Sequence, residues 1–444
     1  MISPSTLNKH VRGQFAQCGK CFQSVELQSV REWENEKTSR STGNYYQFGR
    51  PSRFDHPSEH DCGTLRTNGG NFSPGWLVIW KILKFVVTTI SCLVVALLLS
   101  ALLYRLYLRH KIADARAIHS PHGINSLESV RIGGINQWIE VRGQNVNNPI
   151  LLYIHGGPGI AFIPLAASFQ QPLEQHFTVV EWDQRGAGKT YASNNRDLQR
   201  RTVNVPQMEQ DTLEVVNYLR NRFKGEKIIV VGHSWGSVLG LWLAHEHRDL
   251  IYAYVGVGQI VNMQNNAEVV YKDELQQARS LHNNQTVKEL EAIAPYPPAN
   301  ADMAKMFVAN KWAGELLGPP PSGADFTGVK RILTDVVSAP EYSLADDVGF
   351  VRGQMFSGQI LFPQLSKVDL TKLGPDFRVP IFFFEGRRDP FCRPSLIAEY
   401  SQTINAPKKE LVWFDNSGHF PFYEEKQKFA DELDRRVLPL ATNR

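Results

Sequence analysis

The sequence has little excess charge and few of the motifs that bind metals or cofactors. Its formal net charge is +4 over 444 residues, which argues against a nucleic-acid or an acidic partner. Its thirteen histidines are scattered without a metal-ligand spacing such as His-Glu-x-x-His, and no glycine-rich loop of the phosphate-binding kind is present. We therefore expect chemistry without a metal, a cofactor or nucleic acid.

Cysteine is also scarce, with five in the whole chain. Cys18 and Cys21 form one Cys-x-x-Cys pair, and His60 and Cys62 lie together further along the chain. A zinc site is disfavoured because a second Cys-x-x-Cys pair is missing and the gap between the two groups is long. From residue 126 onward Cys392 is the only cysteine, so no disulfide forms within that part of the chain. A domain without disulfides is compatible with either side of a membrane.

One stretch lacks charge altogether. Phe85 to Tyr104 contains 20 residues without Asp, Glu, Lys or Arg, and at about 1.5 Å per residue it is about 30 Å long, the thickness of a bilayer's hydrocarbon core. A buried core helix rarely stays uncharged over this length, and a cleaved signal peptide is shorter and has a small-residue cleavage site. We therefore predict a single transmembrane anchor with its flanks at residues 76–111. Aromatic residues suited to the membrane interfaces flank the run: Trp76, Trp80, Tyr104 and Tyr107.

The side of the membrane on which the rest of the chain lies stays open. Within about 20 residues of the run there are three Lys/Arg before it and four after it, and a difference of one does not decide topology. The residues counted are Arg66, Lys81, Lys84, Arg105, Arg109, Lys111 and Arg116.

Residues 1–75 differ in composition from the rest of the chain. They are rich in Ser, Asn, Gln, Gly and Arg and have few aliphatic residues and no sustained periodicity, so we expect a disordered extension. No methionine lies between Met1 and Met208. This gives the hypothesis that translation begins at a non-Met codon just before the anchor, which the mass of the native N-terminal peptide would test.

From about residue 126 onward, strand and helix patterns alternate. Short apolar runs of the kind buried between helix layers are followed by helical spacing, and the alternation stops for over a hundred residues after the sixth strand. This indicates an α/β fold with a mostly parallel sheet, whose core comprises residues 126–258 and 376–444, interrupted by a helical cap at 259–375. The expected strands are 130–132, 138–141, 150–154, 177–182, 228–231, 251–257, 379–384 and 410–414, and helices are expected at 208–223, 267–281, 287–293 and 423–437.

The pentapeptide Gly232-His233-Ser234-Trp235-Gly236 lies between an apolar strand and a buried helix. A Gly-x-Ser-x-Gly in this context is typical of a nucleophile elbow, a turn so tight that side chains at the flanking positions would clash. The turn presents the serine hydroxyl above the sheet, and the helix N-terminus directs free N–H groups at developing negative charge. Ser234 is therefore the candidate nucleophile.

Three further motifs follow strands at the edge where open α/β sheets place their sites. They are His155-Gly156-Gly157-Pro158-Gly159, Gly386-Arg387-Arg388-Asp389 and Asn416-Ser417-Gly418-His419. Each alone is compatible with a turn or a bend, but the order Ser234, Asp389, His419 is that of a Ser-Asp-His triad on such a sheet. The N–H groups of Gly157 and Trp235 are candidate donors to an oxyanion.

With these motifs the sequence resembles the α/β-hydrolase superfamily and, more narrowly, the proline iminopeptidases. Asp183-Gln184-Arg185-Gly186-Ala187-Gly188 also carries the resemblance, which covers about residues 126–444 apart from most of the insertion. It implies that Ser234 is the nucleophile, that His419 is general base and then acid, and that Asp389 orients His419. Asp183 and Arg185 are expected to support the site's geometry.

The insertion at 259–375 is expected to form a cap over the site and to contact the substrate. Iminopeptidases that this sequence resembles hold the substrate's α-amino group with cap carboxylates. The cap offers aromatic residues that line a pocket or hold the cap together, at Phe307, Trp312, Phe350, Phe356 and Phe362. Its candidate carboxylates are Glu268, Glu274, Glu289, Glu291 and Glu315.

We interpret the chain as a membrane-anchored serine hydrolase acting on a small molecule or short peptide, with a proline iminopeptidase-like aminopeptidase as the first hypothesis. A carboxylesterase or lipase-like hydrolase of small or lipid-like acyl esters is the alternative. A catalytically idle, hydrolase-like binding module is the alternative from another class, and the oligomeric state stays open.

Overall fold

The computed structural model describes residues 74–298, 302–318 and 329–442. The cysteines and histidine weighed as zinc ligands, and almost all of the segment expected to be disordered, lie outside the described residues. The chain divides into two units, Met1–Lys81 and Ile82–Arg444. The second unit contains every strand found among the described residues and every candidate site residue.

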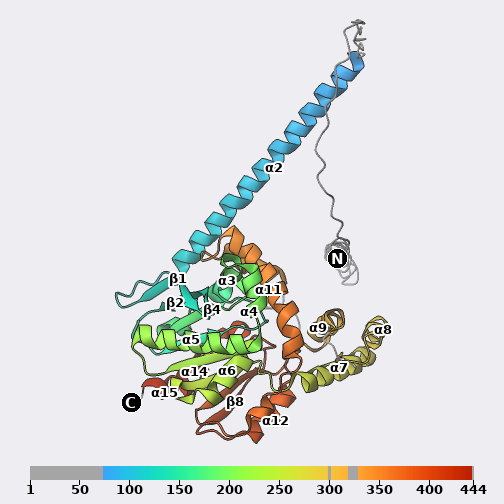
Figure 1. Ribbon diagram of the computed structural model, residues 1–444. Helices are drawn as coiled ribbons and strands as arrows, with labels where there is room; N and C mark the ends of the chain where they lie inside the picture. The colour runs from blue at the N-terminus through green and yellow to red at the C-terminus, as the bar shows by residue number, and fades with distance from the viewer. Residues whose placement is uncertain (1–73, 299–301, 319–328, 443–444) are drawn as a thin grey trace, which may run out of the picture. The chain divides into compact units, whose positions relative to one another are not determined.

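An eight-stranded sheet forms the centre of the second unit, in the order β1-β2-β4-β3-β5-β6-β7-β8 (Figure 1). The pairs β1–β2 and β2–β4 are antiparallel and all the others are parallel, which confirms the predicted mostly parallel α/β-hydrolase sheet. Every expected strand is present, several of them a few residues longer. The bounds are β1 (Ile124–Ile132), β2 (Ile135–Gly143), β3 (Ile150–Ile154), β4 (Thr178–Asp183), β5 (Ile228–His233), β6 (Ile251–Val257), β7 (Ile381–Gly386) and β8 (Lys409–Phe414).

The sheet is buried on both faces because its central strands are apolar at successive positions. In β3, Leu152 and Ile154 belong to one hydrophobic core and Leu151 and Tyr153 to the other, as the two-residue repeat of a strand requires. Figure 1 shows α5 and α6 along the sheet. The helices outside the insertion are α3 (Gly188–Ser193), α4 (Arg196–Thr202), α5 (Val205–Phe223), α6 (Trp235–Glu246), α12 (Pro394–Thr403), α13 (Pro421–Glu424), α14 (Lys426–Arg436) and α15 (Pro439–Thr442).

The helices between β6 and β7 form two groups. In the first, α7, α8 and α9 pack together around a small core of their own that contains Ala278, Leu290 and Trp312. In the second, α11 packs on α3, and α10 packs on α11 and the short helix η1 (Ile163–Ser168). The bounds are α7 (Met263–Ser280), α8 (Asn284–Ala292), α9 (Met303–Leu317), α10 (Val329–Ser338) and α11 (Leu344–Leu365).

One long helix, α2 (Pro74–Ala115), precedes the sheet. Its part Val78–Ala115 is long and apolar enough to cross a membrane, with a mean hydropathy of 2.6 in its most apolar window and none of that window buried. It is therefore a candidate transmembrane helix by length and composition.

The C-terminal turns of α2 pack against the folded domain. Arg105 and Arg116 are both buried, and Arg105 forms an ion pair with Asp347 at 2.8 Å while Arg116 forms one with Glu341 at 2.7 Å. Two of the four basic residues counted after the uncharged run are therefore neutralised by carboxylates of the folded domain. The count of basic residues thus gives even less support to either membrane topology.

Candidate active site

Ser234 occupies a strained turn between β5 and α6. Its φ is +51° and its ψ −117°, a conformation that side chains rarely adopt. The flanking glycines are required by space, since a Cβ on Gly236 would lie 1.9 Å from the carbonyl oxygen of Ile154 and one on Gly232 would lie 2.6 Å from that of Gly236. The turn therefore has the geometry expected of a nucleophile elbow.

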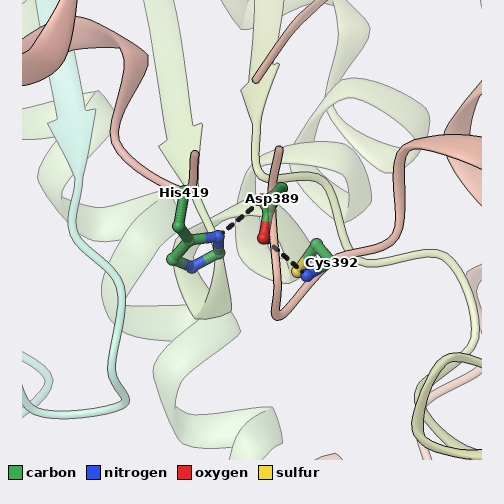
Figure 2. A group of neighbouring side chains, drawn as sticks. All are labelled: Asp389, Cys392 and His419. Carbon is green, nitrogen blue, oxygen red and sulfur yellow. Dashed lines mark hydrogen bonds and ion pairs between the residues drawn. The ribbon is translucent and has the colours of Figure 1, made fainter. Parts of the chain in front are cut away.

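Asp389 and His419 are brought together from the ends of β7 and β8. The Nδ1 atom of His419 lies 2.7 Å from Oδ2 of Asp389, and Asp389 is fully buried (Figure 2). The other carboxylate oxygen, Oδ1, accepts hydrogen bonds from the backbone N–H groups of Phe391 and Cys392, both at 2.8 Å. With Asp389 bonded to Nδ1, the Nε2 atom of His419 is available to a hydroxyl.

Ser234 and His419 both line one cavity of about 540 Å³. Its wall also includes Gly157 from the loop after β3. The cavity thus joins the ends of β3, β5 and β8, and Asp389 lies directly behind its wall through the bond to His419. Three triad candidates predicted from separate motifs therefore belong to a single site.

His419 is held from two further directions. Its carbonyl oxygen lies 2.8 Å from Nε2 of His233. Burial, followed by the charge of His419, lowers the pKa of His233 well below its usual value. His233 is therefore neutral and donates this hydrogen bond. Gly258 lies against the His419 ring, because a Cβ there would be 2.7 Å from Cε1 and 2.8 Å from Nδ1. Neither support was predicted from the sequence.

Asp389, Cys392 and His419 place three potential metal-ligand atoms within 4.8 Å of one another (Figure 2). Both carboxylate oxygens of Asp389 are already engaged by N–H donors. Burial and then the charge of Asp389 raise the pKa of the Cys392 thiol well above its usual value, so it stays protonated and is a poor ligand. This chemistry fits a His-Asp pair better than a metal site.

The two candidate oxyanion donors lie on segments that Gln184 joins. Gly157 has a φ of +119°, and a Cβ there would be 2.6 Å from the backbone nitrogen of Gly159, so the loop depends on glycine. Trp235 is the first residue of α6, where backbone N–H groups have no partner within the helix. Gln184 accepts a bond from the Trp235 indole at 3.0 Å and donates one to the carbonyl of His155 at 2.9 Å.

Asp183 and Arg185 lie outside the cavity wall. Asp183 is buried and accepts hydrogen bonds from the Tyr342 hydroxyl and the backbone N–H of Lys189, while burial raises its pKa to about 7. Arg185 forms a two-point ion pair with Asp211 at 2.8 and 3.0 Å. Both residues thus stiffen the loop that carries Gln184, in keeping with the supporting role expected for them.

The five cap aromatics divide between the cavity and the protein interior. Phe307 and Phe362 line the cavity, and Phe307 is 75% exposed. Trp312, Phe350 and Phe356 are instead buried in three different hydrophobic cores.

Among the five cap glutamates, Glu274 has a distinct environment. It is fully buried, and neither carboxylate oxygen has a hydrogen-bond partner among the described residues. Burial raises its pKa to about 8. Glu289 is hydrogen-bonded to Trp312. Three of the others are at least partly accessible to solvent: Glu268, Glu291 and Glu315.

Glu274 lies on the stripe of α7 that faces the cavity. Ala267 and Val270 line the cavity, and Glu274 follows Val270 by one helical turn on the same face. Tyr296, which also lines the cavity, has its pKa raised to about 12 by burial and by the charge of Glu274. Glu274 does not itself line the cavity; it lies one helical turn beyond Val270 on the same face of α7, and its charge acts on Tyr296 in the cavity wall.

Comparisons with known proteins agree with this architecture. The profile of the alpha/beta hydrolase fold matches residues 149–318. The chain is 30% identical over 318 residues to a probable aminopeptidase, YbaC, of Bacillus subtilis, covering 70% of this chain and 96% of the relative. It is 22% identical over 315 residues to a proline iminopeptidase of Saccharolobus solfataricus, covering 68% of this chain and 89% of the relative. The crystal structure of a proline iminopeptidase from Mycobacterium smegmatis shares the fold, with a TM-score of 0.52 at 18% identity over 72% of this chain and 99% of that one.

Proposed function

We propose that this chain, which belongs to the α/β-hydrolase family, is a membrane-anchored serine hydrolase that removes an N-terminal residue, often proline, from small amides or short peptides. The observation that carries the proposal is the His419–Asp389 pair, with its 2.7 Å bond, in one cavity with the elbow serine Ser234. The relationship to a probable aminopeptidase over 96% of that protein's length supports the peptidase class.

In the proposed mechanism, Ser234 attacks the carbonyl carbon of the substrate. Nε2 of His419 takes the hydroxyl proton, and Asp389 stabilises the resulting imidazolium through the bond to Nδ1. The tetrahedral intermediate then expels the amine, which receives the same proton from His419 and leaves an acyl-serine ester. Water deprotonated by His419 hydrolyses that ester and restores the Ser234 hydroxyl.

Stabilisation of the oxyanion is assigned to the backbone N–H groups of Gly157 and Trp235. Both lie on rigid segments, one fixed by its glycine-dependent turn and the other by the start of α6. The two bonds of Gln184 hold these segments in register. A preorganised pair of donors of this kind is worth about 10²-fold or more in rate per donor.

Aminopeptidase specificity is assigned to Glu274. An ionised carboxylate that is buried without a partner is costly, and here the cost is expressed as a pKa of about 8. A substrate ammonium group in the part of the cavity lined by Val270 and Tyr296 would supply the missing countercharge. Glu274 is thereby the cap glutamate best suited to hold a free α-amino group.

Membrane anchoring is assigned to α2. Its apolar part is long enough to span a bilayer and is not buried by the protein, so a lipid environment would remove its exposed apolar surface from water.

Labelling with a fluorophosphonate probe tests the serine hydrolase proposal. The wild-type full-length protein should be labelled, and Ser234→Ala should not. The matched control is Ser237→Ala, which removes a hydroxyl one helical turn away that is bonded to the carbonyl of Ser234 and should remain labelled. A wild-type protein that stays unlabelled under conditions that label a known serine hydrolase would favour the idle binding module.

Substrate class is tested by comparing a prolyl-naphthylamide with p-nitrophenyl butyrate. Glu274→Gln should lower kcat/KM for the amide at least about tenfold while leaving the ester rate within about twofold, since only the amide carries an amino group. Glu315→Gln, on an exposed site of α9, is the matched control and should change neither. Cleavage of the N-acetylated amide at the rate of the free one would contradict the role of Glu274.

A hydrolase of apolar acyl esters is the second candidate, favoured by the composition of the cavity wall. Apolar side chains outnumber polar ones along the wall of the cavity that Ser234 lines, among them Ile160, Phe162, Ile260, Phe362 and Leu365. A preference for long-chain over short-chain acyl esters, together with no effect of Glu274→Gln on any substrate, would favour this function over the peptidase.

A further inference from the structure

We propose that the exposed apolar surface of α10 and α11 lies on the membrane, docked into the headgroup layer of the leaflet from which α2 emerges. We call this surface the α10–α11 face. Its docking depends on the proposed membrane anchoring by α2 and adds a second membrane contact, made by the insertion itself. It consists of six exposed apolar residues: Leu333, Val337, Leu344, Val348, Val351 and Met355.

The position of the face relative to the bilayer follows from Arg105. This residue directly follows the uncharged run that ends at Tyr104, so its backbone marks the end of the hydrocarbon core. Its guanidinium donates hydrogen bonds to the carbonyl oxygens of Val337, at 2.9 Å, and Tyr342, at 3.2 Å. The segment connecting α10 to α11 is therefore held within one side-chain length of the hydrocarbon boundary.

This attachment is rigid, because several contacts form it together. Arg105 also pairs with Asp347 at 2.8 Å, and Arg109, one turn further along α2, donates a bond to the carbonyl of Pro340 at 2.6 Å. All of these partners lie in residues 337–347. The depth of the connecting segment is thus fixed by α2 itself.

The face is continuous with that segment and is apolar along its length. Leu344 is 62% exposed and Val348 50% exposed, and they are followed on the same side of α11 by Val351 and Met355. From Leu344 to Met355 the stripe is about 16 Å long. In water this arrangement leaves large side chains solvated, whereas at the depth set by Arg105 the nearest apolar medium is the bilayer.

The charges around the face fit an anionic lipid surface. Lys330 and Arg352 are exposed beside it on α10 and α11. The acidic side chains of the same elements are each engaged by a cation within the protein: Asp335 by Arg331, Asp346 by Lys189 and Asp347 by Arg105. The uncompensated charge at the face is therefore positive, which favours negatively charged headgroups.

The experiment uses the full-length chain reconstituted into vesicles of phosphatidylcholine and phosphatidylglycerol. Cys18, Cys21 and Cys62 are replaced by Ser, and a polarity-sensitive fluorophore is attached to a cysteine introduced by Leu344→Cys or Val348→Cys. The matched control is Leu281→Cys, an apolar position 58% exposed at the end of α7. The parent without an introduced cysteine gives the labelling background.

We expect nitroxide-bearing lipids to quench the labels at 344 and 348 at least about threefold more than the label at 281, and iodide in the water phase to quench in the opposite order. Iodide quenching at 344 and 348 equal to that at 281 would overturn the proposal. So would shielding from both quenchers, because a protein surface such as a second copy would then cover the face.

Carbonate extraction of the same vesicles separates this inference from the anchoring on which it rests. A protein that stays in the vesicles but has water-exposed labels contradicts only the docking of the α10–α11 face. A protein that carbonate releases contradicts the proposed anchoring by α2, and the docking proposal falls with it.

Discussion

Gly258 shows how a residue outside the triad fixes the geometry of the site. It has a φ of +53°, and a side chain there would meet both the His419 ring and, at 3.3 Å, Oδ2 of Asp389. The backbone of the next residue, Gln259, is held by a hydrogen bond to buried Glu385 at 3.0 Å, so the turn has little freedom to move away.

We predict that Gly258→Ala lowers kcat by about tenfold or more, because the added methyl group displaces His419 from Asp389. Gly374→Ala is the matched control: Gly374 also has a positive φ, +84°, but its Cβ would meet nothing within 4 Å. Both variants carry backbone strain, and thermal unfolding of each variant measures its cost. Steady-state kinetics then shows whether kcat falls further in Gly258→Ala, where His419 is displaced as well. Equal kcat in the two variants would contradict the positioning role.

The sequence predicted the triad candidates because each lies in a short motif directly after an apolar strand. The expected arrangement of the strands was enough to predict that Ser234, Asp389 and His419 meet at the carboxyl edge of the sheet. Gln184, Gly258 and Glu274 were not distinguished in this way, since their roles depend on contacts between segments far apart in the sequence. Glu274 was one of five cap glutamates until burial separated it from the rest.

At the level of secondary structure, the strands were predictable and the arrangement of the insertion was not. Apolar runs bounded by glycine motifs mark the strands, whereas the helices of the insertion differ in what they pack against. The helices α7–α9 form their own small core while α11 packs on α3. Likewise, Arg105 and Arg116 read as membrane-flanking charges in the sequence, and only tertiary contacts reveal their partners in the folded domain.

The attachment of α2 to the domain predicts that replacing Arg116 strongly lowers the stability of the domain. Its guanidinium lies near three carboxylates, Glu341 at 2.7 Å, Glu140 at 3.5 Å and Glu174 at 3.9 Å, and Glu140 and Glu174 are buried. Arg116→Met should destabilise the domain by about 3 kcal/mol, because it leaves buried acidic groups without their cation.

Thermal unfolding of the full-length protein in detergent micelles measures this effect. Arg109→Met is the matched control, since Arg109 lies on the same helix and donates one hydrogen bond to a carbonyl oxygen, that of Pro340. It should cost about 1 kcal/mol. A loss for Arg116→Met no larger than that for Arg109→Met would mean that the buried acids find other compensation.

Across the whole molecule, several buried carboxyl groups hold protons near neutral pH. Burial raises the pKa of Glu274 to about 8 and that of Asp183 to about 7. It also raises the pKa of Glu181 and Glu385 well above the usual value. In the unfolded chain the same groups ionise near pH 4, so between those values the folded state binds more protons than the unfolded state.

The domain should therefore lose stability as the pH rises from 6.5 to 8. In that window the unfolded chain has already released its carboxyl protons while the folded domain must still release them, which makes the slope of stability against pH negative. The buried histidines act in the opposite direction but only at lower pH, because burial lowers the pKa of His155 to about 4 and the unfolded value is about 6.5.

Glu274→Gln should flatten the slope without adding a buried charge, and Glu315→Gln should leave it unchanged. Melting temperatures of the three proteins at half-unit pH steps measure the slopes, and a melting temperature that rises from pH 6.5 to 8 would contradict the assignment of neutral buried carboxyl groups.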